Sequence, residues 1–146
     1  MTMKQAESVL EDRRVNVKAK LAFLWVALMF FYLYNDLFSM FQPGHVAQLV
    51  EGQLEGVRFT QTVLFSAAVL MAFPSFMILL SLTLKAKANR LVNMIIGILH
   101  IFVLLGTQFV GETDSWFYWR FYELLELLFL VLIIWTAWKW PTAESR

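Results

Sequence analysis

Residues 127–135 read LLFLVLIIW, a run that leaves no polar side chain on any face of a helix. It lies inside a longer apolar stretch, Trp116 to Trp138, which is long enough to cross the roughly 30 Å hydrocarbon core of a bilayer. A helix of a soluble four-helix bundle needs a polar face. Because this run has none, the sequence predicts a membrane-spanning helix here.

Three further stretches have the same length and apolar character. They cover residues 21–41, 60–84 and 91–110, and 60% of the whole chain is hydrophobic, against about 45–50% in soluble domains. A chain of 146 residues suits one domain. We therefore expect an all-α membrane protein, in which residues 1–146 form a single bundle of four transmembrane helices at about 21–41, 60–84, 91–110 and 116–138.

Basic residues mark one side of this predicted bundle. With four crossings, the N-terminal segment, the link between the second and third helices and the C-terminal segment share one side. Most of the lysines and arginines lie in these three segments: Lys4, Arg13, Arg14, Lys18, Lys20, Lys85, Lys87, Arg90, Lys139 and Arg146. Cytoplasmic loops carry such an excess, so we expect both termini to be cytoplasmic.

The segment after the first helix begins Gln42-Pro43-Gly44 and continues HVAQLVEGQLEGV. Its spaced apolar residues predict a short amphipathic helix in the first outer loop, lying on the outer interface or capping the bundle. The polar segment 5–18 is expected to form a short helix on the cytoplasmic surface.

Several function classes are excluded or left without support. The chain has no cysteine, which excludes disulfides, Cys-ligated zinc and iron–sulfur clusters. No nucleophile triad, phosphate loop or nucleotide fingerprint is present, so no catalytic residue is predicted and an enzyme is the less favoured class. Basic residues sit at segment ends rather than in a patch, so we expect no nucleic-acid partner. No cofactor is indicated.

Ionisable residues inside the predicted helices carry the functional hypothesis. Such groups cost about 2.5–3.5 kcal/mol each at the helix centre on insertion scales. A rise of about 1.5 Å per residue puts Asp36 and Glu123 at one level, with Glu126 one turn deeper and His100 near the midplane. We predict a polar cavity in the outer half, while the cytoplasmic half is largely apolar. The candidate residues for this cavity are Asp36, Arg58, Gln61, His100, Gln108, Arg120, Glu123 and Glu126.

Two interpretations of this cluster stay open. In one, Arg58 and Arg120 neutralise the acids in an internal ion-pair network that serves the fold alone. In the other, the cavity opens outward and binds a cation, a proton or a small polar ligand. Two arginines cannot neutralise three acids, so we expect one carboxyl group to be protonated or paired with His100.

Three function classes follow. The leading one is a channel-like or transport-related membrane protein, which could act as a homo-oligomer through small residues such as Ala67, Ala68 and Gly97. The second is a membrane oxidoreductase or accessory subunit that uses quinone, haem or a metal. His100 and Glu126 are the metal candidates, but a di-iron bundle uses Glu-x-x-His pairs and this chain has Glu123-x-x-Glu126. The third is a structural or interaction subunit.

Four segments of the chain together resemble a family of small bacterial membrane proteins with a domain of unknown function. These segments are LEDRRVNVKAKLAFLW (10–25), YNDLFSMFQPG (34–44), LMAFPSFMILLSLTLKAKANRLVN (70–93) and the EL…IIWTAWKWP ending at Pro141. The resemblance implies a four-helix bundle in the bacterial inner (plasma) membrane. It implies no activity, so function has to be argued from the residues.

Overall fold

The computed structural model describes residues 15–109 and 116–141. The predicted helix over residues 5–18 falls mostly outside them. Their elements, in chain order, are α1 (Val17–Ser39), α2 (His45–Val50), β1 (Gln53–Leu54), β2 (Val57–Arg58), α3 (Gln61–Thr83), α4 (Ala86–Thr107) and α5 (Phe117–Trp138).

Four of the helices within these residues, α1, α3, α4 and α5, are long and apolar enough to cross a membrane. The predicted helices are therefore found, but two begin earlier than expected. The Asn16 side chain caps α1 by accepting a hydrogen bond from the Lys18 backbone N–H over 2.9 Å. Because lysine and arginine are good helix formers, α1 and α4 extend beyond their apolar stretches. Lys87 and Arg90, expected in a link, thus lie in α4.

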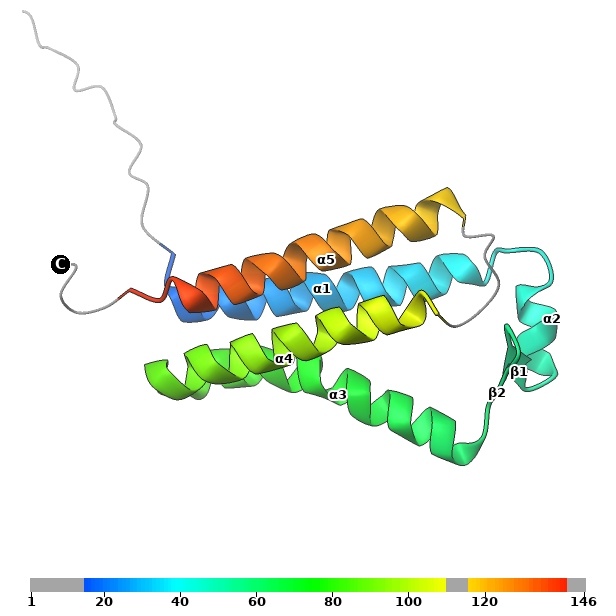
Figure 1. Ribbon diagram of the computed structural model, residues 1–146, viewed down its shortest axis with the longest axis horizontal. Helices are drawn as coiled ribbons and strands as arrows, with labels where there is room; N and C mark the ends of the chain where they lie inside the picture. The colour runs from blue at the N-terminus through cyan, green and yellow to red at the C-terminus, as the bar shows by residue number, and fades with distance from the viewer. Residues whose placement is uncertain (1–14, 110–115, 142–146) are drawn as a thin grey trace, which may run out of the picture.

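The long helices alternate in direction (Figure 1). α1 packs against α3 and α5, while α4 packs chiefly against α5. The first and last described residues lie beside the α3–α4 link, and α2 and the β-hairpin lie at the opposite end (Figure 1). We call the first of these the basic end, because six lysines and arginines of the described residues lie there, and the second the hairpin end. The six are Lys18, Lys20, Lys85, Lys87, Arg90 and Lys139.

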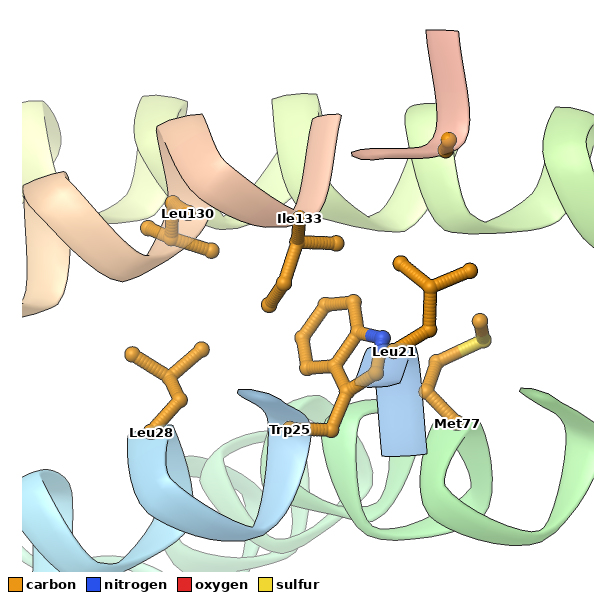
Figure 2. Packing of buried hydrophobic residues seen from close by; sticks show 7 residues of the cluster. Leu21, Trp25, Leu28, Met77, Leu130 and Ile133 are labelled. Atoms are coloured by element: carbon orange, nitrogen blue, oxygen red, sulfur yellow. The ribbon is translucent and has the colours of Figure 1, made fainter. Parts of the chain in front are cut away.

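The apolar core lies towards the basic end. Leu21, Trp25 and Leu28 of α1 face Leu130 and Ile133 of α5, and Met77 of α3 packs beside them (Figure 2). All of these side chains are at most 1% exposed.

A buried hydrogen-bond network sits beside this core, where the sequence predicted an apolar half. The indole N–H of Trp25 donates to Oδ1 of Asn93 over 2.7 Å, and Ser81 donates to the same atom over 3.3 Å. The amide of Asn93 donates to Oδ1 and to the backbone carbonyl of Asn89. Asn89 in turn donates to the carbonyl of Ser81 over 2.6 Å. The network therefore ties α1, α3 and α4 together.

α3 diverges from the bundle over its N-terminal half. Pro74 lies inside α3 and is buried, and the helix bends near its middle (Figure 1). A proline in a helix removes one backbone hydrogen bond and favours a kink. Every residue from Gln61 to Val69 is exposed, so this half of α3 leaves the hairpin-end half of α4 uncovered on one side.

The first loop holds more structure than a single helix. α2 is the short helix that was predicted, and the hairpin after it was not. β1 and β2 pair antiparallel, with Gln53 opposite Arg58 and Leu54 opposite Val57. Glu55 and Gly56 at the turn have φ of 47° and 80°, the pair of positive values that a type I′ turn requires.

Candidate functional site

A pocket of about 220 Å³ lies in the hairpin-end half of the bundle. Its polar lining comes from α1, α4 and α5, and α3 contributes only Met71. The polar and aromatic lining residues are Tyr32, Asn35, Asp36, His100, Thr107, Trp119, Glu123 and Glu126. The bend of α3 explains why this helix contributes so little, because its N-terminal half diverges from the bundle and residues 61–69 are exposed (Figure 1).

Glu126 and His100 are the two deepest ionisable groups of this pocket. Glu126 is 3% exposed and His100 is 1% exposed. Within the part of the chain that the structure describes, Oε1 of Glu126 and Nε2 of His100 have no hydrogen-bond partner. Buried polar atoms are almost always paired, so two such atoms beside one pocket indicate a place that a ligand or water fills.

The other atoms of these two residues are held in place. The Tyr32 hydroxyl lies 3.3 Å from Nδ1 of His100, and the two rings stack with centroids 6.0 Å apart. Trp25 meets the same imidazole edge-on at 6.2 Å. The Asn35 side chain hydrogen-bonds to the Glu126 carboxyl group. One face of each side chain is therefore fixed, and the unpaired atoms are left for the pocket.

A second polar cluster joins α4 to α5 at the rim. Arg120 forms an ion pair with Glu123, with Nη1 2.9 Å from Oε2. Gln108 lies between them, because its amide donates to Glu123 and its carbonyl oxygen accepts from Arg120. Arg120 is 54% exposed and Glu123 is 13% exposed. In this rim cluster the charge of Glu123 is neutralised by Arg120, as the ion-pair interpretation predicts for that one acid.

A smaller pocket of about 130 Å³ lies next to the first one, on the side of the loop region. It is lined by Ser39, His45 and Glu55 among others, and it shares Asn35, Asp36 and Trp119 with the larger pocket. These three residues stand between the loop and the deep carboxyl group of Glu126. The loop is anchored above them: Gln42 donates to the Tyr118 hydroxyl over 2.7 Å, and Ser39 Oγ lies 3.2 Å from Nε2 of His45.

The structure brings six of the eight candidate residues together. Asp36, His100, Glu123 and Glu126 line the larger pocket, and Gln108 and Arg120 complete its rim. Arg58 lies in the hairpin and Gln61 begins the divergent half of α3, and both are exposed. The ion-pair interpretation also allowed Arg58 to neutralise Asp36, and no such pair is found among the described residues, where Arg58 lies in the β-hairpin. Pairing of a carboxyl group with His100, one of the two alternatives given for the unneutralised acid, is likewise not found there.

Sequence reasoning missed Tyr32, Asn35 and Trp119 as lining residues. Tyr32 and Asp36 are four residues apart and Asn35 adjoins Asp36, so helical spacing places all three on one side of α1. Trp119 lies four residues before Glu123 on α5, on the same helix face. Helical spacing was sufficient to predict all three, because each lies one turn from, or next to, Asp36 or Glu123, which were among the predicted residues.

The pocket lining is acidic. Asp36, Glu123 and Glu126 line it, and among the described residues no lysine or arginine lines either pocket. The residues that the structure describes contain no group of three or more His, Cys, Asp or Glu side chains placed to hold a metal ion.

Comparison with known proteins gives one match. The model of a family of unknown function, DUF6326, matches residues 9–145, which covers nearly the whole chain. This confirms the resemblance to a family with a domain of unknown function. No curated protein and no solved structure matches the chain.

Proposed function

The chain belongs to DUF6326, a family of unknown function, and from its own residues we propose that it is an integral membrane protein whose acidic pocket binds a small cation. In this proposal α1, α3, α4 and α5 cross the bilayer, the basic end faces the cytoplasm and the pocket is reached from the outer side. Binding of this kind would serve a channel-like or transport-related role.

The charge distribution supports the orientation. Six of the eight described lysines and arginines lie at the basic end and two, Arg58 and Arg120, at the hairpin end, whereas the described aspartates and glutamates all lie in the hairpin-end half. Cytoplasmic segments near membrane helices carry the excess of positive residues. Trp135 and Trp138 near the C-terminus of α5 fit the membrane interface at the basic end.

One observation carries the proposed binding: Glu126 and His100 are both buried and both line one pocket, and within the described residues each has one polar side-chain atom without a hydrogen-bond partner. An ionisable residue at membrane depth is costly and is normally functional. A carboxyl oxygen and a ring nitrogen can both coordinate a cation or accept a proton. The acidic lining favours a cation over an anion.

The pocket size limits the ligand. At about 30 Å³ per water molecule, 220 Å³ equals about seven waters. This volume suits a partly hydrated monovalent ion or a small organic cation such as methylammonium. Access would run past Asp36 and Trp119, which line both pockets.

Binding can be measured on the purified protein by tryptophan fluorescence, because Trp119 lines the pocket and Trp25 contacts His100. Sodium, potassium and methylammonium are titrated separately at constant ionic strength, with N-methylglucamine as the bulky balancing cation. We expect a saturable signal with at least one probe. Replacing Glu126 with Gln removes the buried charge and should weaken that binding at least tenfold, about 1.4 kcal/mol.

Glu51→Gln is the matched control, because Glu51 is an exposed acid at the end of α2 that lines neither pocket. It should bind like the unchanged protein. A protein that gives no saturable signal with any probe, or a Glu126→Gln variant that binds as tightly as the control, contradicts the proposal.

A further inference from the structure

A groove of about 830 Å³ runs between α1 and α5 at the basic end, away from the acidic pocket. Phe23 and Leu24 of α1 and Phe129 and Trp135 of α5 form its apolar walls. Lys20 and Lys139 also line it. The groove therefore combines an apolar surface with two positive charges.

The charges and the apolar walls lie at different depths. Lys20 is in the first turn of α1 and Lys139 directly follows the last residue of α5, so both lie at the basic end. Phe129 is ten residues before Lys139, a distance of about 15 Å along a helix. This equals about half of the 30 Å hydrocarbon core, which is the depth of one lipid leaflet.

The electrostatics at the mouth of the groove favour an anion. Lys139 holds its Nζ 4.1 Å from the centroid of the Trp135 ring, a cation–π contact on the groove wall. No aspartate or glutamate among the described residues lies at the basic end. Within the described residues neither Lys20 nor Lys139 forms an ion pair, so their charges are not neutralised by a described carboxylate.

We propose that this groove binds one anionic phospholipid of the inner leaflet, with its phosphate at Lys20 and Lys139 and an acyl chain along Phe23, Leu24 and Phe129. Basic pockets between helices on the cytoplasmic side are the kind of site that anionic headgroups occupy. The inference rests on the membrane orientation of the proposed function. It does not rest on cation binding.

The N-terminal segment is the other occupant to consider, and its sequence fits less well. Residues 1–14 read MTMKQAESVLEDRR, with three basic and three acidic side chains and few large apolar ones. The side chains of this segment therefore have no net negative charge to match the two lysines. A phospholipid supplies both the negative charge and the long apolar chain that the groove lining calls for.

Native mass spectrometry of the full-length protein in detergent tests the proposal. The protein is titrated with phosphatidylglycerol and, separately, with phosphatidylcholine of the same acyl chains. We expect phosphatidylglycerol to bind severalfold more tightly. The double variant Lys20→Gln, Lys139→Gln should bind both lipids equally. The control Lys85→Gln, Lys87→Gln removes the same charge at the same end but outside the groove, and it should keep the preference.

Three results would overturn the proposal: no headgroup preference in the unchanged protein, an equal loss of preference in both double variants, or a preference that appears only when residues 1–14 are removed. The last result would assign the groove to the N-terminal segment. The Glu126→Gln variant is measured in both the lipid and the cation titrations. It should keep the lipid preference while losing the cation response, so that failure of one site is distinguishable from failure of the other.

Discussion

At the scale of single residues, Asn93 uses the full hydrogen-bonding capacity of its side chain. Its Oδ1 accepts from Trp25 and Ser81, and its amide donates twice to Asn89. All four residues are fully buried. A buried polar network of this kind stabilises a structure only while every member is paired, because a lost partner leaves a desolvated group behind.

Asn93→Ala should therefore destabilise the protein by about 1–3 kcal/mol, since it leaves the Trp25 indole N–H and the Asn89 side chain without their partner. Unfolding titrations in mixed micelles with sodium dodecyl sulfate measure this loss. Ser75→Ala is the control: Ser75 is exposed, and among the described residues its hydroxyl donates to the Met71 carbonyl in its own helix over 3.0 Å and to the Met29 sulfur over 3.9 Å. It should change stability by less than about 0.5 kcal/mol. Equal effects would contradict the assignment.

The sequence signal for this network was available only in part. Asn89, Asn93, Gly97 and His100 are spaced four, four and three residues apart, so they share one face of α4. The apolar stretch begins at Leu91, and a helix boundary drawn there leaves Asn89 outside. Hydropathy locates where the lipid-facing surface begins, whereas hydrogen bonding and capping decide where the helix begins.

At the scale of elements, α4 and α5 approach closely at Gly97. A Cβ atom added there would lie 2.9 Å from Cγ1 of Ile134, so this glycine serves a contact inside the chain. Gly97→Leu should overpack the helix pair and cost about 1–3 kcal/mol in the same unfolding titration. Gly106→Leu adds the same side chain to α4 where no atom lies within 4 Å, and it should be tolerated. A neutral Gly97→Leu would contradict the close approach.

The bend of α3 gives a second prediction for an element. Pro74→Ala restores a backbone donor and should straighten α3, which brings its N-terminal half nearer to α4. Spin labels on cysteines at Thr62 and Leu105 should report a shorter distance in Pro74→Ala. A pair at Phe30 and Leu128, on α1 and α5, should not change. An unchanged Thr62–Leu105 distance would mean that packing, and not the proline, holds α3 apart.

The helices were predictable because each apolar stretch is long and uninterrupted. The path of α3 was not, since periodicity assumes a straight helix and places Arg58 and Gln61 towards the interior. A bend at Pro74 turns that half outward. The same bend separates Gln61 from the six candidate residues that meet at the pocket, whereas Arg58 is separated from them because it lies in the β-hairpin.

At the scale of the whole molecule, the separation of charge predicts the orientation. The chain has no cysteine, so single cysteines can be placed without removing others. A cysteine at Glu51 should react with a membrane-impermeant maleimide in intact cells. A cysteine at Lys87 should react only after the membrane is permeabilised. The reverse pattern would invert the orientation and place the acidic pocket on the cytoplasmic side.

The short link between α3 and α4 has a consequence for the order in which the molecule assembles. Ser81 and Asn89 are eight residues apart, on either side of the link formed by Leu84 and Lys85, and they are hydrogen-bonded to each other. Trp25, by contrast, is 68 residues from its partner Asn93. Local contacts form before distant ones, because less chain entropy is lost in closing them. We expect the contacts around the α3–α4 link to form first, with the side-chain oxygen of Asn93 still one donor short. When α1 packs against these two helices, the indole N–H of Trp25 would donate to that oxygen. This one hydrogen bond completes the polar network and fixes the position of α1 along the bundle.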